Sequence, residues 1–96
     1  MLSGCIGGDR IGDILKKPEE YSGKMVNLRG EVTEVFSIPL VSQGAYKLDD
    51  GSGSIWIITE SGTPAKGKTV SVKGTVKTAF VLGGIRGTVV IEESRS

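Results

Sequence analysis

Polar and apolar residues alternate from residue 23 to residue 36, and this alternation predicts a long β-strand. One set of positions faces a core and the other faces water. The apolar positions are Val26, Leu28 and Val32, and the polar positions are Asn27, Arg29, Glu31 and Thr33. Gly30 falls where a core side chain is expected, and a glycine inside a strand marks a bend or a close backbone approach. The pattern therefore predicts a bent strand that coils around a small barrel.

The same pattern returns 44 residues later (67 minus 23), along residues 67–76. Gly, Lys, Val, Gly and Val recur in register, and Gly74 takes the place of Gly30. Two copies are too few for a repeat solenoid, which needs at least three. We therefore expect two similar bent strands in one barrel, the second running from about Lys68 to Phe80.

A short helix is predicted between Asp9, which can cap its start, and about Lys17. Its apolar face consists of Ile11, Ile14 and Leu15. Pro18 ends the helix, because proline has no backbone N–H to donate. We expect this helix to plug one end of the barrel, with Tyr21 packed against the wall.

Three shorter strands complete the pattern, at residues 45–49, 54–59 and 88–92, with a tight turn at 49–53. The inward side chains are Tyr46, Leu48, Ile55 and Ile57, which sends Trp56 and Ile58 to the opposite face. An outward Trp56 is either a platform for stacking or is covered by its own loops or by a neighbouring chain. Residues 60–66 contain Pro64 and leave no room for a helix, and residues 82–87 form the last hairpin.

Composition limits the chemistry of the chain. Ninety-six residues make one domain, and 15 glycines with five aromatic residues suit a turn-rich β protein. The chain has no histidine and one cysteine, so it has neither an internal disulfide nor a thiolate zinc cluster. Asp49 and Asp50 stand beside glycines in a turn, which is more typical of a hairpin than of a calcium site. We expect no enzyme activity, no metal and no cofactor.

Charge is unevenly distributed, although the net charge is only +1. Residues 61–91 carry five basic side chains and no acidic one. One edge of the domain is therefore expected to be locally basic, while the weak overall charge predicts weak binding of any polyanion.

Leu2-Ser3-Gly4-Cys5 resembles the lipobox of prokaryotic lipoproteins, in which the cysteine is lipidated. The alternative is an ordinary cysteine near the start of the chain. The resemblance implies a lipid anchor at Cys5, a place outside the cytoplasm and attachment to the cell membrane. It divides the chain into a signal-peptide remnant with a tether, residues 1–9, and a folded domain, residues 10–96.

Two motifs resemble OB-fold domains of the anticodon-binding and replication-protein-A type. The first is Pro18-Glu19-Glu20-Tyr21-Ser22-Gly23-Lys24 followed by Val26-x-Leu28-x-Gly30-x-Val32, and the second is Tyr46-x-Leu48-x-Asp50-Gly51-x-Gly53-x-Ile55. The resemblance covers residues 10–93. It implies an all-β, five-stranded OB-fold Greek-key barrel with a short N-terminal helix.

The same resemblance implies a binding module that uses the face of the second and third strands and the flanking loops. Single-stranded nucleic acid, or another extended polyanion, is the first expected ligand. The expected ligand-binding residues are Arg29, Lys47, Trp56, Ile58, Lys73, Lys77 and Arg86. The cations would meet phosphates and Trp56 would stack on a base.

A lipid-anchored domain outside the cytoplasm that binds a protein, peptide or glycan is the alternative. Apolar loop tips favour it, because exposed together they would form a patch for a partner or for self-association. The expected contact residues are Ile38, Leu40, Val41, Leu82 and Ile85.

Overall fold

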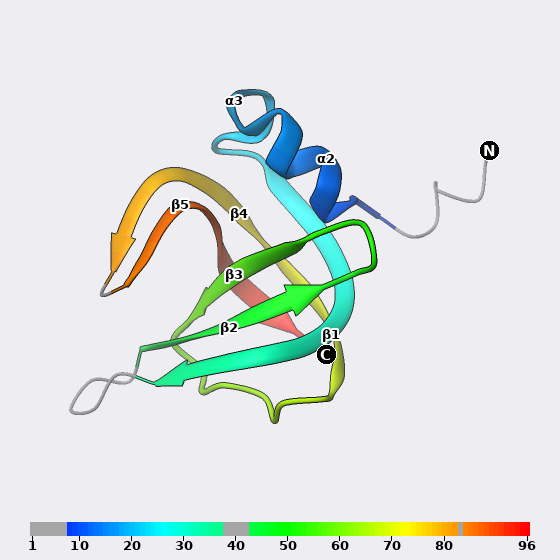
Figure 1. Ribbon diagram of the computed structural model, residues 1–96, viewed down its shortest axis with the longest axis vertical. Coiled ribbons are helices and arrows are strands. Elements are labelled where there is room, and N and C mark those ends of the chain that lie inside the picture. Colours follow the sequence, from blue (N-terminus) through cyan, green and yellow to red (C-terminus); the bar gives the residue numbers. More distant parts are fainter. Residues whose placement is uncertain (1–7, 38–42, 83) are drawn as a thin grey trace.

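The computed structural model describes residues 8–37, 43–82 and 84–96, and it contains two short helices followed by five strands (Figure 1). The elements are α2 (Ile11–Lys16), α3 (Pro18–Tyr21), β1 (Met25–Ser37), β2 (Gly44–Asp49), β3 (Ser54–Thr59), β4 (Thr69–Leu82) and β5 (Ile85–Arg95). Every predicted strand is present, and β5 extends beyond the predicted residues 88–92 at both ends. As predicted, no helix lies between β3 and β4.

The strands close into a barrel in the order β1-β2-β3-β5-β4, in which β3 and β5 are parallel and the other neighbours are antiparallel. The two strands with the repeated pattern pair with each other, Met25–Glu31 against Thr69–Thr75. Their glycines are sites of close backbone approach, as predicted. A Cβ atom on Gly30 would overlap the carbonyl oxygen of Asp49, and one on Gly74 would overlap that of Ile91.

The barrel interior holds one apolar cluster, to which α2 contributes Ile11 and Ile14, both 0% exposed. The helices sit together at one end of the barrel (Figure 1), so α2 plugs it as predicted. Leu15 does not share the buried face and is 43% exposed. The prediction for Leu15 was wrong because the six-residue helix buries only its i, i+3 pair, and Leu15 lies instead against Gly53.

The start of α2 is capped from a distant turn and not by Asp9. Asp50 Oδ2 accepts from the Ile11 N–H at 2.9 Å, and Ser52 Oγ accepts from the Gly12 N–H at 2.9 Å. Asp9 accepts from the Asn27 N–H at 2.9 Å and thereby ties the N-terminal segment to β1. The predicted Asp9 cap was therefore wrong. Pro18 follows the end of α2, as predicted, and also begins α3.

The hairpin of β4 and β5 bends over the outside of the barrel; we call its residues 78–82 and 84–88 the arm (Figure 1). The pairing of β4 with β5 shifts between Lys77 and Phe80, where Ala79 has a φ of 57° and Gly87, the partner of Phe80, has a φ of 109°. The bend lets the arm bury a second apolar cluster against β2 and β3. Its buried members are Ala45, Ile58, Ile85 and Val89.

Candidate ligand-binding surfaces

One row of outward side chains crosses four strands of the barrel. Lys47 on β2 pairs with Trp56 on β3, Trp56 with Val89 on β5, and Val89 with Lys77 on β4. Side chains at paired positions lie on the same face of a sheet. The indole is therefore flanked along the row by a lysine on either side, one directly beside it and one beyond Val89. We call these four residues the indole row.

Trp56 lies on the outer face, as predicted, and its surroundings combine both sequence-based alternatives. It is half-buried because it packs against the second cluster, beside the arm. Lys47 Nζ stands 5.7 Å from the ring centroid, within the range of a cation–π contact. The chain thus covers part of this platform with its own residues and leaves part of it open.

The arm overturns two predictions of exposure. Ile58 is 4% exposed and Ile85 is 5% exposed, because each packs in the second cluster. The Ile85 side chain is therefore not available to a ligand or partner in this conformation, and Ile58 reaches the surface only as part of the wall of a cleft beside the arm. Alternation correctly assigned Ile58 to the outer face but could not reveal that the arm covers it.

The predicted cations do not form one surface. Lys47 and Lys77 belong to the indole row, and Arg86 is exposed on the arm. Arg29 and Lys73 instead line a groove of about 540 Å³ between β1, β4 and the end of β5. The sequence predicted Arg29 on the face of β2 and β3, but its paired residue is Ser71 on β4.

A cleft of about 330 Å³ lies between β3, the arm and β5. Its apolar walls are Ile58, Phe80 and Ile91, and Glu60 and Glu93 line it as well. No Lys or Arg lines this cleft among the described residues, so phosphate groups find no counter-charge there.

The predicted lipidation site Cys5 and several predicted contact residues fall outside the described residues: Ile38, Leu40, Val41 and the side chain of Leu82. The large apolar side chains that are exposed near those segments are Val35 and Phe36, each 39% exposed, and Val81, 67% exposed. In the part of the chain that is described, neither helix has the length and hydrophobicity needed to cross a bilayer.

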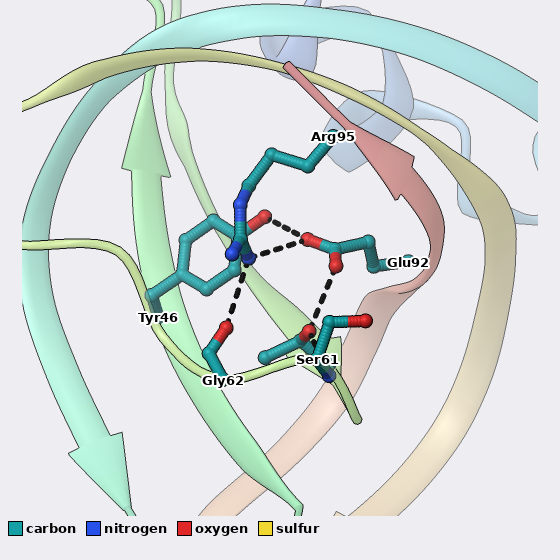
Figure 2. Close-up of polar contacts among 6 residues, drawn as sticks. Tyr46, Ser61, Gly62, Glu92 and Arg95 are labelled. Atoms are coloured by element: carbon teal, nitrogen blue, oxygen red, sulfur yellow. Dashed lines mark hydrogen bonds and ion pairs between the residues drawn. The ribbon is translucent and has the colours of Figure 1, made fainter.

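Sequence reasoning missed a polar cluster inside the barrel, centred on Glu92 (Figure 2). The Glu92 side chain is 3% exposed and accepts from Tyr46 Oη, from Thr59 Oγ1 at 2.8 Å and from Arg95 Nη1 at 3.0 Å. Arg95 Nη1 also donates to the carbonyl of Gly62 at 3.0 Å. Two signals pointed to it, since an inward Tyr46 needs a partner for its hydroxyl and Glu92 shares the parity of Val90.

Burial, followed by the hydrogen bond to Glu92, raises the pKa of Tyr46 well above its ordinary value of 10.0. Burial lowers the pKa of Arg95, but the hydrogen bond with Tyr46 and the charge of Glu92 outweigh it and raise that pKa. The phenol stays protonated and the guanidinium charged. Every buried polar side-chain atom among the described residues has a partner, and these residues contain no group of three or more His, Cys, Asp or Glu side chains placed to hold a metal ion. The cluster therefore holds β2, β3 and β5 together.

No protein-family model and no curated protein matches the chain. Similar solved structures include asparaginyl-tRNA synthetase from Pyrococcus horikoshii, with a TM-score of 0.65 and 20% identity over 80% of this chain and 20% of that one. A putative aspartyl-tRNA synthetase from Leishmania major Friedlin has a TM-score of 0.67 and 18% identity over 88% of this chain and 19% of that one. OBody AM3L09 bound to hen egg-white lysozyme has a TM-score of 0.63 and 19% identity over 79% of this chain and 82% of that one.

This chain spans about a fifth of the length of the two synthetases. Identities near 20% show a shared fold and leave ligands open. The strand order, the N-terminal plug and these structural neighbours together identify the chain as an OB-fold domain.

Proposed function

We propose that this OB-fold domain is a non-catalytic module that binds single-stranded nucleic acid or another extended polyanion along the indole row. The observation that carries the proposal is a half-buried indole with Lys47 beside it and Lys77 further along the same row. Likeness to synthetases named for tRNA supports the same class of ligand. Lys47 and Lys77 are separated by three interstrand spacings, roughly 14 Å, so each can meet a different phosphate.

Lys47 has two roles in this mechanism. In the free domain its ammonium faces the ring of Trp56 at 5.7 Å, which keeps the platform covered by a mobile side chain. When a base approaches, Lys47 moves to a phosphate oxygen and the base stacks on the exposed part of the indole. The lysines supply affinity through counterion release. The indole can stack on any base, so binding should depend little on the nucleotide sequence.

Fluorescence titration with single-stranded oligonucleotides at several salt concentrations tests the proposal. Lys47→Gln and Lys77→Gln should each lower the slope of log affinity against log salt by about 0.7, the value for one phosphate contact on a single strand. Trp56→Leu should weaken binding about tenfold or more, since stacking on one base contributes roughly 1–3 kcal/mol. Lys24→Gln, an exposed lysine outside the row, is the matched control. Binding that ignores salt, or variants that match the control, would contradict the proposal.

A second candidate is a domain outside the cytoplasm, anchored by lipid at Cys5, that binds a protein, peptide or glycan. Exposed Phe36 and Val81 favour it, because they give a partner apolar area to cover. The structural neighbour OBody AM3L09 is bound to hen egg-white lysozyme, which supports a protein as the partner. The acidic cleft suits cationic side chains better than phosphates.

Two measurements test the second candidate. Mass spectrometry of the native protein extracted from membranes should show a lipid on Cys5. Light scattering should show self-association that Val81→Ser weakens, if the partner is another copy of the chain. An unmodified Cys5 in the native protein would contradict the proposed lipid anchor. A strict monomer in solution would contradict self-association.

A further inference from the structure

The groove between β1, β4 and the end of β5 lies apart from the indole row and presents its polar side chains in two rows. Asn27 on β1 pairs with Lys73 on β4, and Lys73 pairs with Ser94 on β5. One step along the groove, Arg29 pairs with Ser71, whose backbone N–H and C=O both bond to Ser96. The six side chains form a grid of two cations, three hydroxyls and one amide.

The irregular pairing of β5 creates this grid. Gly74 pairs with Glu92 but Lys73 pairs with Ser94, so Glu93 is an extra residue without a partner in the ladder. The extra residue reverses the alternation that follows it. Arg95 consequently points into the barrel toward Glu92, and Ser94 and Ser96 point outward beside Lys73 and Ser71.

The grid is partly preorganised for an anion. Arg29 Nη1 donates to Ser71 Oγ at 3.0 Å, which holds the guanidinium along the groove while its other donors remain available. Asn27 is exposed, as are Lys73 and Ser94, in a groove of about 540 Å³. No carboxylate side chain lines it among the described residues. Two carboxylates mark the limits of this positive region. Asp9 accepts a hydrogen bond from the backbone N–H of Asn27, and Glu31 lies two residues beyond Arg29 on the same face of β1.

We infer that this groove is a second binding site, which takes a tetrahedral oxyanion such as a phosphate group. Arg29 offers a planar fork of donors, Lys73 a point charge on the facing strand, and the serine hydroxyls short neutral donors. A carboxylate presents two oxygens and suits Arg29 alone, whereas a phosphate has oxygens enough for both cations and a hydroxyl. The inference does not rest on the indole row, because none of its residues belongs to that row.

Two-dimensional NMR titration with inorganic phosphate at low salt tests the inference. Amide shifts should saturate and centre on Arg29, Ser71 and Lys73. Arg29→Gln and Lys73→Gln should each weaken binding about tenfold, and Ser71→Ala should weaken it less because it removes only the partner of Arg29.

Lys24→Gln, an exposed lysine that belongs to neither the groove nor the indole row, is the matched control and should leave phosphate binding in the groove unchanged. Thermal unfolding of each variant verifies that the exposed substitutions leave the barrel folded. Shifts that never saturate, or that are reduced equally in Lys24→Gln and Lys73→Gln, would overturn the groove site. Such a result would leave oligonucleotide binding at the indole row intact, because that binding depends on Trp56.

Discussion

Glu92 and Arg95 stand three residues apart on β5, yet their side chains meet inside the barrel at 3.0 Å. In a regular strand, residues i and i+3 lie on opposite faces. The unpaired Glu93 reverses the alternation and brings both side chains to the inner face. One extra residue thus builds the polar cluster inside the barrel and the serine side of the groove outside it.

Substitution of Glu92 should lower the free energy of unfolding more than substitution of any other polar residue in the domain. Glu92→Ala leaves the Arg95 charge and the Tyr46 hydroxyl inside the barrel without their acceptor, and we expect a loss of about 3–5 kcal/mol in the free energy of unfolding. Urea denaturation at neutral pH measures it. Glu93→Gln, at the exposed neighbouring position, should stay within about 0.5 kcal/mol of the original chain. Equal losses in Glu92→Ala and Glu93→Gln would contradict a stabilising role of the polar cluster.

Alkaline pH should weaken the fold through Tyr46. Its pKa is raised in the folded state, so the folded chain keeps a proton that the unfolded chain releases above about pH 10.0. The stabilisation is therefore complete below pH 10 and declines as pH rises beyond it. Denaturation curves recorded from neutral to alkaline pH should show this decline, and Tyr46→Phe should lack its share of it. If the stability of the original chain and of Tyr46→Phe changed equally with pH, that result would contradict the raised pKa of Tyr46.

Asp50 should stabilise the domain as the remote cap of α2. Asp50→Ala removes the acceptor of the Ile11 N–H, and we expect a loss of about 0.5–2 kcal/mol, the usual range for a lost N-cap. Asp50→Asn keeps a neutral acceptor and should lose less. Chemical denaturation should rank the free energy of unfolding in the order original chain, Asp50→Asn, Asp50→Ala, from highest to lowest.

The Asp50 effect should also depend on pH. Burial raises the pKa of Asp50, but hydrogen bonds from Ile11, Ser52 and Gly53 outweigh it and hold that pKa below its ordinary value of 3.8. The stabilisation is thus present above pH 3.8 and disappears as the carboxylate is protonated at lower pH. The advantage of Asp50 over Asp50→Asn should shrink in acid. An advantage that grows in acid would contradict this account.

Gly74 should tolerate no side chain. In Gly74→Ala the new Cβ would overlap the Ile91 carbonyl and lie 2.7 Å from Val90 Cγ1, so we expect a loss of about 1–3 kcal/mol or more. Gly84→Ala is the matched control, because its Cβ would meet nothing within 4 Å. It should be neutral or slightly stabilising. Thermal melts compare the two, and similar midpoints would disprove the role of Gly74.

Local pattern was enough to predict the strands and their two bends, and the resemblance of two motifs implied the OB-fold. Alternation identified the strands and their inward residues, because period-two burial is a property of each strand by itself. Gly30 and Gly74 marked the two corners, since only glycine lets two backbones approach so closely. The strands and their bends follow from these short-range rules, whereas the strand order depends on pairing between distant segments.

Contacts between distant segments decided the surfaces. Alternation assigns Ile58 to a face but cannot reveal that the arm, bent at Ala79 and Gly87, covers it. Composition counts cations but cannot reveal that Arg29 lies beside Ser71 on β4 whereas Lys47 lies beside Trp56 on β3. The cap of α2 comes from Asp50, 39 residues away. Burial, charge and caps at these sites depend on which strands meet, and only the closed barrel settles that, because a single unpaired residue such as Glu93 reverses every face beyond it.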